Sequence, residues 1–516
     1  MNRDDLLKNL DTPEWDIIII GGGATGLGAA VDSASRGYKT LLLEQHDFAK
    51  ATSSRSTKLI HGGLRYLQQG NIRLVKEALH ERGILCENAP HLVHPLPFLV
   101  PLYHWWEGPF YGLGLKVYDL LAGKLGIEAS KHLSRRQTLK ALPNLHKDGL
   151  RGGVLYYDGQ FDDARLALTL AQTAHDAGAT VLNYFKVTSM IKKKGKIVGV
   201  RARDEETGNH VPIFAKAVIN AAGIFADDVR RLDQPKTSPE LVPSQGVHIV
   251  LPSSFLDSKT AILVPHTDDG RVIFLVPWHG RVLVGTTDTA LKKPVLEPKA
   301  HPEEIAFLLK HAARYLTKEP KPSDVLSHFA GIRPLVKEKG SRKTSAISRD
   351  HSVTISPSGL VTIVGGKWTT YRKMADDAVD HAILAGMLPP RGCCTGGLKL
   401  HGYAKGLDPQ DPLSSYGSDQ KLIQKLTRAH PALKKKLAPD LPYTYAHVLW
   451  ALDHEMARTV EDVLSRRTRL LLLDARAALK AAPALARFMG KHLKRSKKWE
   501  SNQVAEFSNL AKRYYL

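Results

Sequence analysis

The chain has 516 residues, of which 43% are hydrophobic, and its net charge at pH 7 is +22. That length suffices for two or three domains with substantial cores. Cys86 and the neighbouring pair Cys393 and Cys394 fit neither a disulfide framework nor a zinc site, so a reducing compartment is expected. No apolar run reaches the ~18–20 residues that a membrane-spanning helix needs. The first 16 residues have the features of neither a secretory signal nor a transit peptide.

A strand, a glycine-rich turn and a helix are predicted near the start of the chain. Residues 16–20 are an apolar run typical of a buried parallel strand. The turn GGGATG at residues 21–26 follows the pattern G-x-G-x-x-G and leads into a predicted helix over residues 27–36, followed by a second strand at residues 40–43. In this dinucleotide-binding unit the glycines admit a pyrophosphate to the helix N-terminus, and an acidic side chain after the second strand takes a ribose hydroxyl. The residues predicted to contact the cofactor here are Gly21, Gly23, Gly26 and Glu44.

A run of hydroxyl side chains follows at residues 51–66, ATSSRSTKLIHGGLRY. An ordinary polar loop is one interpretation of its composition. Its position favours another, because the segment leaves the strand end where an α/β sheet binds its ligand. Small hydroxyl groups can donate hydrogen bonds along a cofactor, and paired glycines allow close approach to a flat ring. The cofactor contacts predicted in this segment are Thr52, Ser53, Ser54, Ser56, Lys58, Gly62 and Gly63.

The segment resembles the flavin-contacting segment of the FAD-dependent glycerol-3-phosphate dehydrogenases, a branch of the D-amino-acid-oxidase-like flavoproteins. The resemblance continues, in the family's order, through VHIV at 247–250, GTTD at 285–288, GIRPL at 331–335, SRD at 348–350 and GGKWTTYR at 365–372. A weaker resemblance covers residues 453–474. Several dispersed motifs in one order are more specific than a single glycine pattern.

The resemblance implies FAD as cofactor and oxidation of sn-glycerol 3-phosphate to dihydroxyacetone phosphate, with two electrons passed to a membrane quinone. This is a reaction of glycerol metabolism. A glycerol-3-phosphate oxidase of the same family, which reduces oxygen to peroxide, is the alternative. An amino-acid substrate is a further alternative, but a single carboxylate needs fewer cations than this chain offers. The basic charge comes without a nucleic-acid-binding motif, so no nucleic-acid partner is predicted.

The chemistry of alcohol oxidation indicates which side chains the site requires. A base must take the hydroxyl proton while the carbon gives a hydride to the flavin, and histidine has a suitable pKa. His61 is the first candidate and His248 the second, and the resemblance places Arg333 where a cation would stabilise the developing alkoxide. A phosphate monoester needs several cationic donors. The resemblance gives this role to Arg65, Tyr66, Arg349 and Lys367.

A second set of cofactor contacts is predicted further along the chain. Residues 217–223 form a strand that runs into a glycine turn. Residues 365–367 precede a helix whose N-terminal dipole would stabilise negative charge on the reduced flavin. The contacts predicted from these two segments are Ala222, Gly223, Gly365, Gly366 and Thr369.

The predicted fold class is α/β, with a Rossmann-like FAD-binding domain, an inserted antiparallel-sheet substrate domain and an α-helical C-terminal cap. The oxidoreductase region covers residues 14–385, and its FAD-binding parts are about 14–98, 153–240 and 335–385. The substrate domain covers about 241–334, with 99–152 as a membrane-facing insertion. Residues 386–417 form a linker and residues 418–516 a helical domain.

Basic clusters and one aromatic segment suggest peripheral attachment to an anionic membrane at its cytoplasmic face. The clusters are residues 192–194, 434–436, 466–467 and 491–498. The aromatic segment begins at Tyr103 and continues to Ile127; it is too rich in glycine to span and typical of an interfacial anchor. A buried loop and helix is the alternative. No metal site is predicted, and a homodimer is left open.

Overall fold

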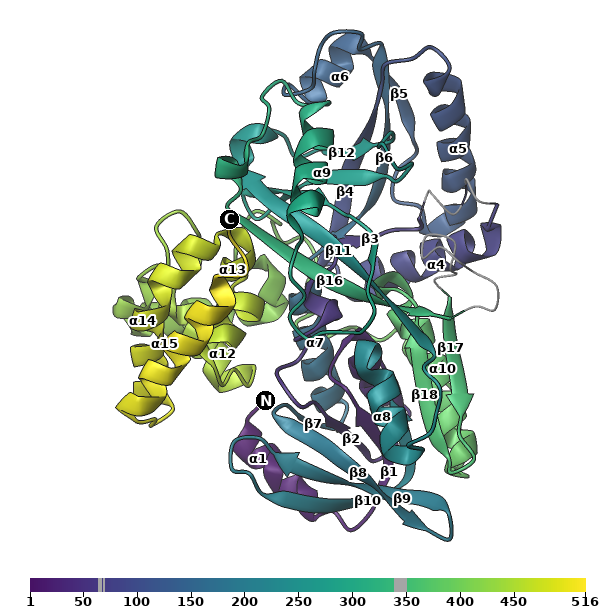
Figure 1. The fold of residues 1–516 in the computed structure, drawn as a ribbon, viewed down its shortest axis with the longest axis vertical. Helices are drawn as coiled ribbons and strands as arrows, with labels where there is room; N and C mark the ends of the chain where they lie inside the picture. Colours follow the sequence, from purple (N-terminus) through teal and green to yellow (C-terminus); the bar gives the residue numbers. More distant parts are fainter. Residues whose placement is uncertain (64–66, 68–69, 338–349) are drawn as a thin grey trace.

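The structure is a computed structural model that describes residues 1–63, 67, 70–337 and 350–516 (Figure 1). The predictions for Arg65, Tyr66 and Arg349 therefore lie outside the described residues. The described chain forms two sheets and a group of C-terminal helices, coloured yellow-green to yellow in Figure 1. The predicted fold class is confirmed.

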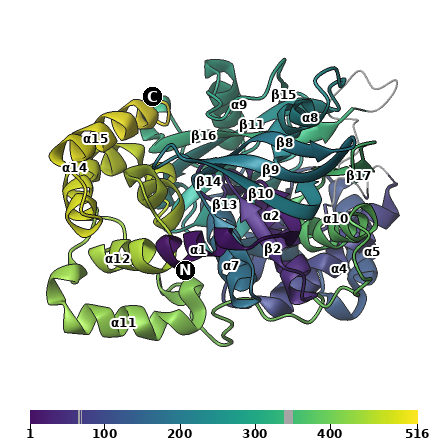
Figure 2. The same ribbon diagram turned by 90° about the horizontal axis from the view of Figure 1, so that it is seen from below.

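The first sheet carries the predicted dinucleotide-binding strands. Parallel strands run in the order β18, β10, β1, β2 and β7, and β17, β9 and β8 extend the sheet in antiparallel fashion. Ile17, Ile18 and Ile19 of β1 are fully buried, because helices and the β8–β9 hairpin pack around the strands (Figure 2). Burial on both faces explains the uninterrupted apolar run. The strands are β1 (Trp15–Ile20), β2 (Thr40–Leu43), β7 (Thr180–Leu182), β8 (Phe185–Lys193), β9 (Lys196–Asp204), β10 (His210–Asn220), β17 (His351–Ile355) and β18 (Leu360–Gly365).

Helices connect these strands and pack on them. α2 lies between α7 and α10 and makes the crossover from β1 to β2 that the glycine turn predicted. α8 packs against β8 and β18. The helices of this part are α1 (Arg3–Lys8), α2 (Ala24–Ser35), α4 (Ile72–Asn88), α7 (Asp163–Asp176), α8 (Ala226–Asp233) and α10 (Tyr371–Ala385).

The second sheet combines strands from several parts of the chain. Its order is β15, β11, β14, β13, β12, β4, β6 and β3, with β16 paired to β11 and β5 paired to β6. Most pairs are antiparallel, and β12 pairs with β4 in parallel. The strands are β3 (Leu59–Ile60), β4 (Val93–Leu102), β5 (Lys131–Ser134), β6 (Gly152–Phe161), β11 (Leu241–Pro252), β12 (Ala261–Val264), β13 (Ile273–Trp278), β14 (Arg281–Gly285), β15 (Thr289–Ala290) and β16 (Ser327–Val336). α5 (Glu107–Ala122), α6 (Arg135–Ala141) and α9 (Pro302–Ala313) accompany this sheet.

The strands β3, β4 and β6 differ from the predicted domain boundaries. Residues 14–98 and 153–240 were expected in FAD-binding parts, yet β4 and β6 pair with each other along their whole lengths within the second sheet. β4 contains Pro95, Pro97 and Pro101, which lack the N–H that a sheet ladder uses, so the sequence pattern conceals the strand.

The C-terminal helices pack on one face of the second sheet. Val250 of β11 shares a hydrophobic cluster with Leu470–Leu473, whereas its neighbour Ile249 packs with α9 on the other face. This alternation places the sheet between two layers. The helices are α11 (Gln420–Ala429), α12 (Tyr445–His454), α13 (Leu470–Leu473), α14 (Ala475–His492) and α15 (Lys497–Ala511), preceded along 386–413 by chain without helix or strand.

The pair Arg466 and Arg467 corrects the interpretation of one basic cluster. The two side chains are 2% and 0% exposed, and both form ion pairs with Asp47, which follows β2. They lie in a π-helical turn, Asp462–Arg467. These two charges therefore hold the C-terminal region to the first sheet and do not contribute to a basic surface.

A pH-dependent contact joins the same two regions at His401. Its Nδ1 lies 2.6 Å from Asp176 and its Nε2 lies 2.9 Å from Asp419. These two carboxylates raise the pKa of His401 to about 9. Because the folded-state pKa is raised, the stabilisation is present in full below pH ~6.5 and is lost as the pH rises through 9. The melting temperature of the wild-type protein should therefore exceed that of His401→Gln most at pH 6 and least at pH 9.5. A difference that stays constant over that range would contradict the assignment.

Candidate active site

A cavity of about 910 Å³ lies where the carboxyl ends of β1, β2, β10 and β18 meet the second sheet. In open α/β sheets this edge is where ligands bind, and the volume is within the range of cofactor sites. From the first sheet it is lined by Gly21, Gly23, Glu44, Ala222, Gly223, Gly365 and Gly366. From the loop after β2, from the second sheet and from the β18–α10 turn it is lined by Thr52, Ser53, Ser56, His61, Gly63, His248, Arg333, Lys367 and Thr369.

The glycine turn holds the β1 strand end close to α2. Gly21 has φ +113°, and a Cβ there would lie 2.6 Å from the carbonyl oxygen of Ala221. A Cβ at Gly26 would lie 1.9 Å from the carbonyl oxygen of Gly21. Gly26 does not line the cavity, so its role is to let the helix approach the strand. This matches the packing function of the third glycine in such turns.

Replacing Gly26 with alanine should weaken FAD binding about 10- to 100-fold, because relieving the clash costs about 1–3 kcal/mol and shifts the turn. The matched control is Gly114→Ala, another helical glycine, whose Cβ would meet nothing within 4 Å. Dissociation constants from flavin fluorescence titration measure both. Equal FAD affinity in the two variants would show that the turn tolerates the methyl group.

Glu44 lies at the end of β2 and lines the cavity. Its Oε2 accepts a hydrogen bond from the backbone N–H of Gly22 at 2.6 Å, and its Oε1 accepts one from His46 N at 2.8 Å. Burial raises the pKa of Glu44. The two backbone donors fix the carboxylate, which keeps acceptor capacity for a hydroxyl group at the cavity wall.

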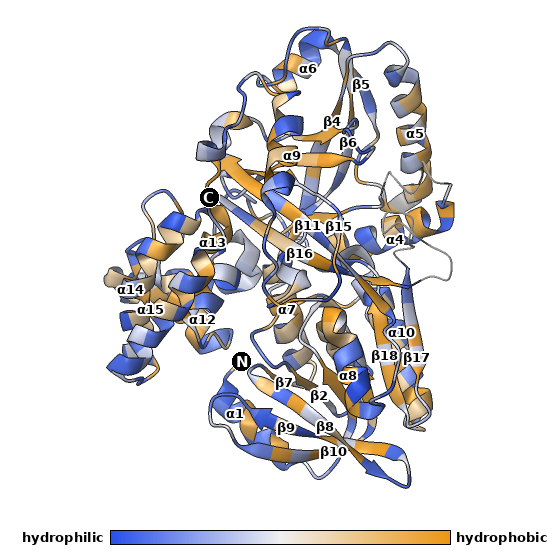
Figure 3. Ribbon diagram, in the orientation of Figure 1, coloured by the Kyte–Doolittle hydropathy of each residue, from blue (hydrophilic) through white to orange (hydrophobic). Residues whose placement is uncertain are grey.

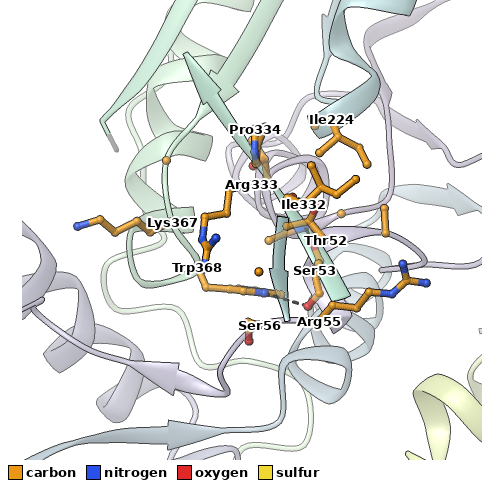
Figure 4. Close-up of a pocket in the computed structure, with 18 of the residues that line it drawn as sticks. Thr52, Ser53, Arg55, Ser56, Ile224, Ile332, Arg333, Pro334, Lys367 and Trp368 are labelled. Carbon is orange, nitrogen blue, oxygen red and sulfur yellow. Dashed lines mark hydrogen bonds between the residues drawn. The ribbon is translucent and has the colours of Figure 1, made fainter. Parts of the chain in front are cut away.

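The loop after β2 ties several cavity walls together. The Oγ of Ser53 accepts a hydrogen bond from Ala24 N at 2.9 Å, at the N-terminus of α2. The indole N–H of Trp368 donates to the carbonyl oxygen of Ser53 at 2.9 Å, drawn as a dashed line in Figure 4. Thr52 Oγ1 donates to the carbonyl oxygen of Ile332 at 2.6 Å. One loop therefore contacts the dinucleotide helix, the β18–α10 turn and β16.

Three residues of that segment lie outside the cavity lining, in contrast to the sequence prediction. Lys58 is fully buried and its Nζ lies 2.6 Å from Asp163 Oδ2; burial lowers the pKa of Lys58 to about 7. The side chain of Ser54 is buried beneath the loop. Gly62 N donates to the Tyr118 hydroxyl, and a Cβ there would lie 2.6 Å from Leu79. These three residues hold the loop in place from the side that faces away from the cavity.

The turn between β18 and α10 requires its two glycines. Gly365 and Gly366 have φ +84° and +79°, and a Cβ on Gly366 would lie 2.2 Å from the sulfur of Met374. Thr369, just beyond, exchanges hydrogen bonds of 3.3 Å with the backbone N–H and carbonyl oxygen of His61. The turn thus also fixes the segment that carries the first candidate base.

His61, His248 and Arg333 line the same cavity. His248 is buried, its ring stacks on Phe329 at 4.9 Å, and its Nε2 lies 3.0 Å from Thr57 Oγ1. Burial, together with the charges of Lys58 and Arg333, holds the pKa of His248 well below its usual value.

Arg333 projects from β16 into the cavity beside Trp368 and Thr52 (Figure 4). Its Nη1 lies 3.3 Å from Asp288 Oδ1, and its Nη2 donates to the carbonyl oxygen of Thr287 at 3.2 Å. These partners orient the guanidinium. The sequence motif GTTD supplied Asp288 but did not indicate this role.

Sequence reasoning also missed a group of cavity residues. Arg55 lies within the hydroxyl-rich segment but was given no role of its own, and Lys186 lies in β8, to which no cavity residue was assigned. Phe98, Tyr156 and Phe274 belong to strands whose inward faces were assigned no role, and Arg271 lies before β13. Aromatic residues at alternating positions along these strands were the signal that could have indicated side chains on the cavity face of the sheet.

The residues present fit FAD. The positive φ angles at Gly21 and at the pair Gly365 and Gly366 bring backbone to the cavity wall at two separate turns, and Glu44 stands at the ribose position of a dinucleotide fingerprint. The N-terminus of α2, where Gly23, Ala24 and Thr25 line the cavity, suits a pyrophosphate.

Comparisons with known proteins agree with this site. Residues 16–372 match the family described as FAD dependent oxidoreductase, and residues 361–500 match the family described as C-terminal domain of alpha-glycerophosphate oxidase. The mitochondrial glycerol-3-phosphate dehydrogenase of Mus musculus is 44% identical, over 94% of this chain and 71% of that protein. The Arabidopsis thaliana mitochondrial enzyme is 40% identical, over 97% and 85%.

Solved structures extend the comparison. Glycerol-3-phosphate dehydrogenase from Bacillus halodurans, complexed with FAD, aligns with a TM-score of 0.80 and 30% identity over 99% of this chain and 97% of that one. L-alpha-glycerophosphate oxidase from Mycoplasma pneumoniae, with FAD bound, shares the fold at a TM-score of 0.58 and 20% identity, over 75% and 98%. The chain therefore belongs to the family of FAD-dependent glycerol-3-phosphate dehydrogenases.

Proposed function

We propose that this protein oxidises sn-glycerol 3-phosphate to dihydroxyacetone phosphate and passes the electrons to a membrane quinone. The observation that carries the proposal is one cavity with a dinucleotide turn at one end and His61, His248, Arg333 and Lys367 along the other walls. When bound, FAD accepts the hydride that the alcohol carbon gives up.

Separate side chains accept the proton, stabilise the developing charge and bind the phosphate. His61 accepts the proton from the substrate hydroxyl, and Arg333 stabilises the negative charge that develops on that oxygen. Lys367 binds the phosphate, together with Arg65, Tyr66 and Arg349 from outside the described residues. His61 is favoured over His248 as the base, because His248 lies fully buried with its Nε2 directed at Thr57.

The outer face of α5 supports attachment to a membrane. Phe110, Leu113, Val117 and Leu120 follow helical spacing along one side, and Leu113 and Leu120 are 69% and 80% exposed. Hydrophobic residues continue along much of this helix (Figure 3). Exposed apolar stripes of this kind mark interaction surfaces, and this one fits a lipid interface.

Basic residues accompany this stripe. Lys116 of α5 is exposed, as are Arg135 and Arg136 at the start of α6, which lies near the same end of the molecule (Figure 1). Cations beside an apolar helix favour anionic headgroups. No described helix has the length and apolar character needed to cross a bilayer. We therefore propose peripheral attachment at the inner face of the cell membrane.

Replacing Leu113 and Leu120 together with glutamate should lower binding to phosphatidylglycerol vesicles at least ~10-fold, since each buried leucine contributes about 1.5–3 kcal/mol. Co-sedimentation measures this. The matched control is Leu384→Glu with Leu422→Glu, two exposed leucines on α10 and α11. If the control pair weakens vesicle binding as much, α5 is not the membrane contact.

The electron acceptor is tested with purified protein and glycerol 3-phosphate in air. The proposal predicts reduction of a ubiquinone analogue with little peroxide. Stoichiometric peroxide formation would favour the oxidase alternative instead.

A further inference from the structure

A buried carboxylate joins the cofactor-lining loop to the C-terminal helices. Asp163, the first residue of α7, is fully buried. Its Oδ2 accepts hydrogen bonds from Ser56 N at 2.9 Å, Ser56 Oγ at 2.7 Å and Lys58 Nζ at 2.6 Å. Its Oδ1 accepts a hydrogen bond from Arg469 Nη2 at 2.9 Å. One side chain thus holds two residues of the loop and one residue of the C-terminal region.

The backbone of the loop is a second point of contact. The carbonyl oxygen of Ser54 accepts from Lys58 Nζ at 2.9 Å and from Arg469 Nη2 at 2.7 Å. Arg469 therefore reaches the loop directly as well as through Asp163. Its Nε lies 3.5 Å from Asp162 Oδ2, so two carboxylates balance two buried cations. Buried charges persist only with such pairing.

Both cationic residues have backbones in the left-handed region. Lys58 has φ +64° and Arg469 has φ +58°, and both side chains point to the same carboxylate. Non-glycine residues adopt this conformation at an energetic cost, and it persists where surrounding contacts fix it. The cluster is therefore a defined junction, since a loose charge contact would not hold two strained backbones.

The loop connects this junction to both ends of the cavity. On one side of residues 54–56, Ser53 binds the N-terminus of α2. On the other side, Thr57 binds His248. Lys58 adds an indirect link, because its Nζ lies 5.1 Å from the ring of Phe329, on which His248 stacks. A shift of Ser54 or Ser56 would move the cofactor end and the reacting end together.

We propose that Arg469 is a positioning residue for the cofactor-lining loop, acting through Asp163 and the Ser54 carbonyl. Docking of the C-terminal helices thereby sets the geometry in which FAD binds. The inference rests on FAD binding by this cavity and is independent of the substrate and of the electron acceptor.

The test compares Arg469→Met and Arg469→Lys with Arg458→Met in the full-length protein. Arg458 belongs to the same C-terminal region and binds Glu206 through two hydrogen bonds, of 2.5 and 2.8 Å, but it has no contact with the loop among those described. FAD dissociation constants come from flavin fluorescence. Hydrogen exchange of peptides covering residues 52–58 comes from the FAD-loaded protein, where Ser56 N–H reports directly on its bond to Asp163.

Arg469→Met should weaken FAD binding at least ~10-fold and speed exchange at residues 52–58. Arg469→Lys should show a smaller change, because an ammonium keeps the positive charge beside Asp163 but does not reproduce the guanidinium geometry. Arg458→Met should stay within ~2-fold of wild type. Unchanged FAD affinity and exchange in Arg469→Met would overturn the proposal. So would equal weakening in Arg458→Met, since general loosening of the C-terminal helices would then explain the effect.

A second comparison applies if Arg469→Met does not fold. Ser56→Ala removes one hydrogen bond to Asp163 without changing a charge. Because Ser56 and Arg469 act through the same carboxylate, Ser56→Ala and Arg469→Lys together should weaken FAD binding by less than the product of their separate effects. A combined effect equal to that product would overturn the coupling.

Discussion

Replacing His61 with asparagine is expected to lower kcat about 10²- to 10⁴-fold, the usual contribution of a positioned general base. Asparagine keeps a polar side chain of similar size but cannot take a proton. The contacts of His61 with Thr369 run through its backbone, so the segment should keep its place and FAD should remain bound. Stopped-flow reduction of the bound flavin by glycerol 3-phosphate measures the loss directly.

His248→Asn is the companion variant. Burial and the charges of Lys58 and Arg333 hold the pKa of His248 well below its usual value, so the pH dependence of flavin reduction should persist in this variant and vanish in His61→Asn. If His248→Asn instead abolishes the pH dependence and His61→Asn retains it, the two histidines exchange roles.

Replacing Asp47 with alanine is expected to cost about 3 kcal/mol of stability, because it removes the carboxylate that two buried guanidinium groups share. Arg466 keeps Glu461 and Asp462 as partners, and Arg467 keeps Glu455. Arg467 and Arg466 lower the pKa of Asp47 although burial opposes this, and Asn183 donates to the same carboxylate at 3.4 Å. The contact links the first sheet to the C-terminal helices, so these helices should detach first. Thermal unfolding followed by tryptophan fluorescence records the change.

The control for Asp47→Ala is Asp5→Ala, which breaks an exposed ion pair with Lys8. Exposed pairs contribute at most about 1 kcal/mol, so this variant should melt close to wild type. If Asp47→Ala melts at as high a temperature as Asp5→Ala, the other carboxylates beside Arg466 and Arg467 suffice to stabilise them.

Local sequence patterns predicted the first sheet well, because each of its signals is short. A few consecutive residues are enough to predict the strand at residues 16–20, the glycine turn after it and the strand at residues 40–43.

Contacts between distant residues were outside the reach of pattern reasoning. Lys58 looked like a cofactor contact because it ends a hydroxyl run, whereas its partner Asp163 lies 105 positions further along the chain. Arg466 and Arg467 looked like surface charge because their partner Asp47 is about 420 positions away. Long-range ion pairs leave no trace in local periodicity.

The most direct test of the proposed function is anaerobic titration of the purified, FAD-loaded protein with glycerol 3-phosphate. One equivalent of substrate should bleach the flavin absorbance near its visible maximum, whereas glycerol and D-amino acids should leave it unchanged. Flavin that stays oxidised with glycerol 3-phosphate, or that is reduced equally by glycerol, would contradict the account.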